Sequence, residues 1–130
     1  GHPLQLLTGH EVVVDGALLG GADGSVPGLA NLAPEPYVEM YNAAKAGDWD
    51  KVRECQDYLA RLMFLTRHVN ATVGFGAGVG AFKTALWQMG VFNTNQMREP
   101  VMPLVGNDVT EIVKVLKRAK LMPEFAPVRL

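Results

Sequence analysis

Residues 3–28 read PLQLLTGHEVVVDGALLGGADGSVPG, and this stretch decides the fold class. The first run, residues 3–9, is rich in leucine and stops at Gly9, which predicts a short buried strand. A second short apolar run, Gly24 to Val26, is closed by Pro27 and predicts another strand. Two strand patterns therefore lie close together at the beginning of the sequence.

The segment between these strands, residues 11–19, is ambiguous. Three consecutive valines at 12–14 favour a strand. Residues 17–19 (ALL), followed by two glycines, favour a helix with a glycine stop. We expect a helix, because a strand pattern follows it. Strand, helix and strand with short links are typical of a parallel sheet.

From Pro34 onward the sequence predicts helices. Pro34 and Pro36 suit a first helical turn, and Gly47 ends this helix. Asp48 is a suitable cap for the next one. That second helix has one apolar stripe at helical spacing, made of Val52, Cys55, Leu59, Leu62 and Met63.

The remaining residues predict further helices separated by glycine and proline. Residues 73–80 are glycine-rich and predict a connection, and residues 81–89 predict a helix closed by Gly90. Pro100 and Pro103 interrupt the pattern. Asp108 and Glu111 then form a D-x-x-E capping pattern that begins a last helix. Its predicted buried face consists of Val109, Ile112, Val113 and Leu116.

Composition excludes several classes of protein. A formal net charge of -1 gives no electrostatic reason to expect binding to nucleic acid or to an anionic membrane surface. One cysteine, Cys55, allows no disulfide within the chain, and we expect it to be a core thiol. No apolar run approaches the ~20 residues of a membrane span. The chain starts at Gly1 without a signal-peptide pattern, so we expect a processed start or a start inside a longer protein.

Three groups of residues have a possible chemistry. Residues 76–81 fit G-x-G-x-x-A, but without a clear preceding strand we favour a helix connection over a dinucleotide loop. His10 and Glu11 lack the second histidine of a zinc motif, so we expect substrate contact rather than a metal site. Lys83 lies in an apolar helix, where a snorkelling lysine is more common than a reactive one.

Tyr37 and Tyr41 are expected to be packing residues.

Several runs together resemble the seventh and eighth strands, and the helices after them, of the dihydrodipicolinate synthase and N-acetylneuraminate lyase family. They are residues 6–11 (LLTGHE), 20–26 (GGADGSV), 29–34 (LANLAP), Gly47-Asp48, 83–86 (KTAL) and 98–104 (REPVMPL). The resemblance implies an α/β fold, namely the last two strands of a (β/α)8 TIM barrel followed by C-terminal helices. An isolated chain of this kind would be mostly helical.

The resemblance also implies a function. Members are class I lyases or synthases in which a lysine forms a Schiff base with pyruvate or another 2-oxo acid and a tyrosine relays protons. Both residues would lie upstream of this chain, so we expect no catalytic residue, metal or cofactor within it. Gly9, Glu11 and Val26 match positions beside the substrate. The resemblance further implies a cytoplasmic homotetramer.

These expectations define a domain plan and an alternative. Residues 1–46 would be the final βαβα units of the barrel, 47–122 a C-terminal helical region and 123–130 a tail. Two parallel strands are too few for a sheet of their own, so they need the missing N-terminal barrel segment or a partner chain and would expose apolar surface without it. The alternative is a non-catalytic helical module that packs against a partner chain. Adjacent parallel strands would favour the barrel, whereas helix or disorder over residues 1–30 would exclude it.

Overall fold

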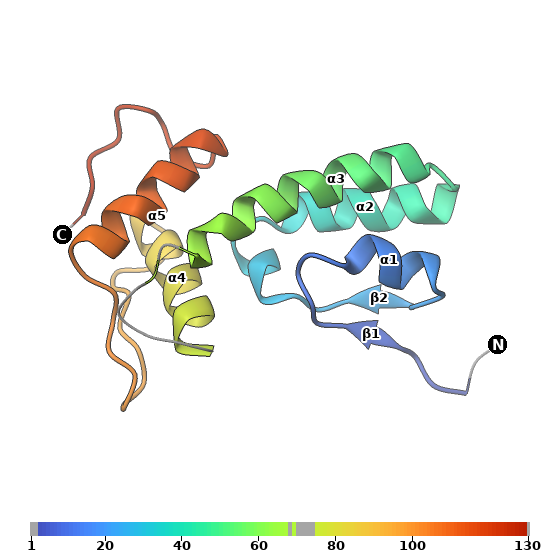
Figure 1. Ribbon diagram of the computed structural model, residues 1–130, viewed down its shortest axis with the longest axis horizontal. Helices are drawn as coiled ribbons and strands as arrows, with labels where there is room; N and C mark the ends of the chain where they lie inside the picture. The colour runs from blue at the N-terminus through green and yellow to red at the C-terminus, as the bar shows by residue number, and fades with distance from the viewer. Residues whose placement is uncertain (1–2, 68, 70–74, 130) are drawn as a thin grey trace. The chain divides into compact units, whose positions relative to one another are not determined.

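The computed structural model describes residues 3–67, 69 and 75–129, and it is mostly helical with one small sheet (Figure 1). The chain divides into two compact units, Gly1–Met63 and Phe64–Leu130. Among the described residues, no helix is long and apolar enough to cross a membrane.

The sheet consists of two short parallel strands, β1 (Leu7–Thr8) and β2 (Gly24–Ser25). Leu7 pairs with Gly24 and Thr8 pairs with Ser25. Helix α1 (Val14–Leu19) connects the strands, as Figure 1 shows. The predicted strand–helix–strand order and the parallel pairing are therefore confirmed. All three elements are shorter than predicted, and α1 begins at Val14 rather than at residue 11.

The prediction that the first strand is buried is wrong for this chain by itself. Leu4, Leu6 and Leu7 are 81%, 67% and 52% exposed, and Val26 beyond β2 is 66% exposed. A strand in a two-stranded sheet has too few neighbours to cover its apolar side chains. The expectation that these strands expose apolar surface is confirmed.

The core of the first unit is formed by its helices. After β2, the 3-10 helix η1 (Gly28–Asn31) leads into α2 (Pro34–Ala46), which packs along α3 (Trp49–Leu62) (Figure 1). The largest fully buried side chains in this unit are Val14, Leu29, Met40, Val52, Leu59 and Leu62. Four of the five predicted stripe residues of α3 are buried, and Met63 is half-buried. A further 3-10 helix, η2 (Met63–Thr66), follows α3.

The turn between α2 and α3 forms as predicted. Gly47 adopts φ 77°, a left-handed conformation that costs glycine little, and it ends α2. The Asp48 carboxylate then accepts a hydrogen bond from the backbone N–H of Lys51 at 3.0 Å and caps α3. Because α2 and α3 pack on each other, the predicted domain boundary between residues 46 and 47 falls inside the first compact unit.

The second unit contains helices α4 (Phe75–Gln88) and α5 (Asn107–Arg118). The predicted glycine-rich connection is wrong from Phe75 onward, because residues 75–80 belong to α4; residues 70–74 lie outside the described part. Packing has overridden the low helix propensity of glycine, since Gly80 is buried beside Leu104.

The beginning of α5 also differs from the prediction. Gly106, with φ 60°, is the N-cap residue, so Asp108 lies in the first turn rather than at the cap position of a capping box. The predicted buried face is confirmed, because Val109, Ile112, Val113 and Leu116 are all buried.

The tail after residue 123 is anchored to the end of α4. The buried side chain of Gln88 donates to the backbone carbonyl of Arg129 at 2.8 Å and accepts from its backbone N–H at 2.9 Å. The Arg129 guanidinium donates to the carbonyl of Trp87 at 3.0 Å, which satisfies a helix C-terminal acceptor.

Candidate functional site

The three predicted substrate-contact residues lie where the two paired strands end. Gly9 directly follows the paired residue Thr8, and Val26 directly follows the paired residue Ser25. The backbone N–H of Val26 donates to the carbonyl of Thr8 at 2.8 Å, which joins the two strand ends. Since the strands are parallel, both residues leave the sheet at the same edge, and Glu11 follows two residues beyond Gly9. We call Gly9, Glu11 and Val26 the rim.

Side chains from two helices bind the backbone of Glu11. Its carbonyl oxygen accepts one hydrogen bond from the Tyr37 hydroxyl of α2 at 3.1 Å and another from Gln56 Nε2 of α3 at 3.2 Å. Burial, and secondarily the negative charge of Glu11, raise the pKa of Tyr37. The Tyr37 hydroxyl therefore keeps its proton at neutral pH and remains a donor.

Tyr37 and Gln56 are functional candidates that the sequence did not reveal in this role. Tyr37 is buried, as expected of a packing residue, but it also donates a hydrogen bond to the loop after β1. Gln56 is only 5% exposed, and its amide oxygen accepts from the backbone N–H groups of Val14 at 2.9 Å and Asp15 at 3.2 Å. The bonded residues lie 26 to 45 positions apart in the sequence, so no local sequence pattern predicts these contacts.

His10 contacts its own loop. Its backbone N–H donates to Thr8 Oγ1 at 3.3 Å, and its Nδ1 accepts from the backbone N–H of Val12 at 3.4 Å. In the part of the chain that the structure describes, no three histidine, cysteine, aspartate or glutamate residues are grouped to hold a metal ion.

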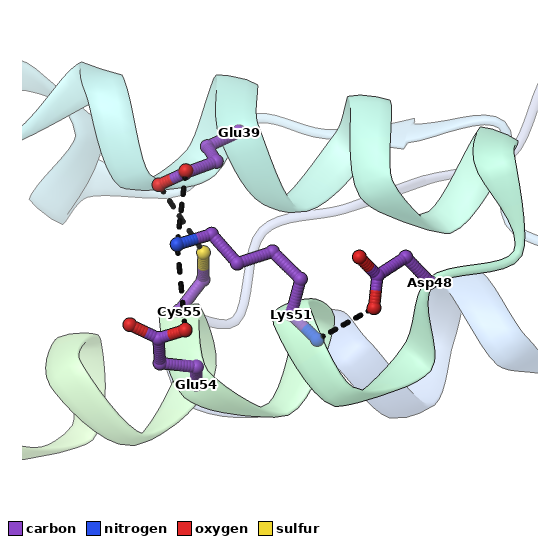
Figure 2. A network of polar contacts seen from close by, with 5 residues as sticks. All are labelled: Glu39, Asp48, Lys51, Glu54 and Cys55. Carbon is purple, nitrogen blue, oxygen red and sulfur yellow. Dashed lines mark hydrogen bonds and ion pairs between the residues drawn. The ribbon is translucent and has the colours of Figure 1, made fainter.

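A second polar cluster joins α2 and α3 (Figure 2). The Lys51 ammonium lies 3.0 Å from Glu39 Oε1 and 3.4 Å from Glu54 Oε2. The Cys55 thiol donates to Glu39 Oε2 at 3.6 Å. Burial, followed by the charge of Glu39, raises the pKa of Cys55, so the thiol stays protonated. These contacts link α2 to α3, and the raised pKa makes Cys55 a poor nucleophile.

The remaining candidates have structural positions. Lys83 lies on α4 in the second unit, where its ammonium donates to the backbone carbonyl of Gln96 at 2.9 Å. Residues 76–81 are helical, so they form no open loop that could surround a pyrophosphate.

Comparison with solved structures defines the class of fold. The chain superposes on dihydrodipicolinate synthase from Bacteroides thetaiotaomicron, a TIM-barrel protein, with a TM-score of 0.74 and 29% identity. The match covers 88% of this chain and 37% of that chain. The chain is therefore similar in fold to part of a (β/α)8 barrel protein.

Sequence comparison defines the family. The sequence model of the Dihydrodipicolinate synthetase family matches residues 1–119, and the chain belongs to this family. N-acetylneuraminate lyase 2 of Escherichia coli is 28% identical over 118 residues, which are 90% of this chain and 36% of the lyase. The 4-hydroxy-tetrahydrodipicolinate synthase of Phenylobacterium zucineum is 29% identical over 122 residues, 94% of this chain and 39% of the synthase. The chain thus spans little more than a third of these relatives.

Proposed function

We propose that this chain is the C-terminal portion of a Schiff-base-forming 2-oxo-acid lyase or synthase, and that β1 and β2 are the last two strands of its barrel. The observation that carries the proposal is the parallel register of Leu7 with Gly24 and of Thr8 with Ser25. This register brings Gly9 and Val26 to one edge, and active sites of (β/α)8 barrels lie at the carboxyl ends of the strands.

The proposed reaction proceeds through an enamine of the 2-oxo acid. A lysine amine adds to the ketone carbon, water leaves, and the resulting iminium loses a proton from the adjacent carbon. The enamine then attacks an aldehyde carbon to form a carbon–carbon bond, and hydrolysis of the new iminium returns the lysine. Cleavage is the reverse sequence. Gly9 leaves space beside the substrate, the Val26 backbone borders the Schiff-base pocket, and Glu11 accepts hydrogen bonds from substrate hydroxyls.

The nucleophile and the proton-relay tyrosine are proposed to lie in the part of the protein that precedes this chain. Lys83 is an unsuitable nucleophile because its ammonium is engaged in a hydrogen bond to the backbone carbonyl of Gln96. Lys51 is unsuitable as well, because hydrogen bonding to Glu39 raises its pKa and keeps it protonated. Because the resemblance implies a nucleophile upstream of these residues, we propose that the chain alone is inactive. Family membership does not favour the alternative of a non-catalytic helical module.

The domain plan and the assembly belong to the same proposal. Residues 1–46 would belong to the barrel, residues 47–122 would form scaffold and subunit contacts, and residues 123–130 would form a tail. The exposed Leu4, Leu6 and Leu7 support this plan, because a neighbouring strand would bury them.

The test follows exchange of the pyruvate methyl protons for deuterium in D2O by proton NMR. Enamine formation releases such a proton whatever the second substrate is, so the identity of the aldehyde is not needed. We expect exchange by the assembled enzyme that contains this chain and none by the chain alone. Absence of exchange by the assembled enzyme would contradict the proposed function. The matched control, Glu11→Gln, should retain exchange because the hydroxyls that Glu11 binds belong to the other substrate.

A further inference from the structure

We infer that Gln56 is a positioning residue that fixes Glu11 at the rim, and that it thereby sets the preference for hydroxylated acceptors. The inference rests on the proposed function for the role of Glu11. It rests on the contacts of Gln56 for everything else.

Gln56 uses both halves of its side-chain amide on one loop. Its Oε1 accepts from the N–H groups of Val14 and Asp15 at 2.9 and 3.2 Å, and its Nε2 donates to the carbonyl of Glu11 at 3.2 Å. The loop between β1 and α1 is therefore held at Glu11 and at the first turn of α1 by one side chain of α3.

The loop has no cap of its own to replace these bonds. Val13 is the N-cap residue of α1 and supplies no side-chain hydrogen bond, so the first backbone donors of α1 depend on Gln56. With six residues, α1 is too short to be stable by propensity alone. Because Gln56 is 5% exposed, water cannot readily take the place of its amide.

Tyr37 supplies a partial second anchor. Its hydroxyl donates to the same Glu11 carbonyl at 3.1 Å, whereas the amides of Val14 and Asp15 donate to Gln56. The two roles of Gln56 can therefore be separated. A carboxylate in Gln56→Glu can still accept from the α1 amides, but it cannot donate to the Glu11 carbonyl and repels it. A leucine in Gln56→Leu removes both roles.

The first measurement tests the contacts directly by amide hydrogen exchange. We expect Val14 and Asp15 to keep their protection in Gln56→Glu and to exchange at least about tenfold faster in Gln56→Leu. Tyr37→Phe is the matched control, since it removes a donor to Glu11 and leaves both α1 amides bonded. Unchanged protection in Gln56→Leu would overturn the inference.

The second measurement distinguishes positioning from general stability. In the assembled enzyme, pyruvate is condensed with glyceraldehyde or with propanal, which lacks the hydroxyls. We expect Gln56→Glu to lower the ratio of kcat/KM for glyceraldehyde over propanal by about tenfold, with methyl exchange of pyruvate unchanged. In a Glu11→Ala background the same substitution should have no further effect on this ratio.

The outcomes separate the inference from the proposed function. Normal methyl exchange with an unchanged glyceraldehyde ratio in Gln56→Glu would overturn the positioning role and leave the proposed function standing. Equal, additive losses with and without Glu11 would also overturn the positioning role, because they indicate a merely structural residue. No methyl exchange by the unsubstituted enzyme would overturn both.

Discussion

Leu6 and Asp23 exchange two hydrogen bonds immediately before the paired strands. The backbone N–H of Leu6 donates to Asp23 Oδ2 at 2.7 Å, and the backbone N–H of Asp23 donates to the carbonyl of Leu6 at 2.8 Å. Since Asp23 adjoins Gly24, these bonds extend the pairing of β1 with β2 by one residue pair. They fix the register that brings Gly9 and Val26 to one edge.

Removal of the Asp23 carboxylate should loosen this register. We expect Asp23→Ala to lower the free energy of unfolding by about 1 kcal/mol, because the Leu6 amide loses its charged acceptor at an exposed site. Asp23→Asn is the matched control, because its amide oxygen can still accept. Urea unfolding and amide exchange at Leu6 measure the effect. A Leu6 amide equally protected in all three proteins would show that the side chain does not hold the strand.

Alkaline pH should destabilise the first unit through Tyr37. Burial and the charge of Glu11 raise its pKa in the folded chain above the value of about 10 that an unfolded tyrosine has. The contribution of Tyr37 to the free energy of unfolding is complete below pH ~10. It is lost as the pH rises beyond that value, because the unfolded state then binds fewer protons than the folded state. We expect the free energy of unfolding to fall more steeply above pH ~10 in the unsubstituted chain than in Tyr37→Phe.

The control for this pH dependence is Tyr41→Phe, on the same helix at an exposed position. Tyr58 adds a similar slope to every variant, because burial also raises its pKa. The difference between the unsubstituted chain and Tyr37→Phe therefore isolates Tyr37. Parallel curves for these two proteins would contradict the prediction.

Cys55 should react slowly with an aromatic disulfide reagent at pH 8, because burial and the charge of Glu39 raise its pKa. Glu39→Gln removes that charge and should accelerate the reaction about threefold. Glu54→Gln is the matched control, because its charge has the smallest effect on the thiol. Equal rates for Glu39→Gln and Glu54→Gln would argue against control of the thiol by Glu39. Urea unfolding of each variant checks that a loss of global stability is not the cause.

Local signals predicted the elements whose ends are determined locally. Gly47 and Asp48 end one helix and begin the next through their own backbone and side chain, so α2 and α3 were predictable. The parallel pair was predictable because short apolar runs flank a helix pattern. The start of α4 was not, because burial of Gly80 beside Leu104 outweighs the local preference of glycine.

The candidate site was predictable only in part. Gly9, Glu11 and Val26 were predicted through a family resemblance and stay a prediction, and the pairing of the strands explains why Gly9 and Val26 share an edge. Gln56 was not predictable in its role, because its partners Val14 and Asp15 lie 42 and 41 residues earlier in the chain. A lone glutamine in an amphipathic helix has no feature that distinguishes such a contact from a solvated one.

The central claim, that this chain forms part of a Schiff-base enzyme but lacks its nucleophile, is tested most directly by intact mass. The purified sample is treated with pyruvate and borohydride, which reduces the iminium to a stable amine. The mass of each chain is then measured by mass spectrometry under denaturing conditions. We expect the 14.1 kDa chain to remain unmodified, with any adduct on a companion that carries the nucleophile. An adduct on the 14.1 kDa chain itself would contradict the claim and make Lys83 the first lysine to replace.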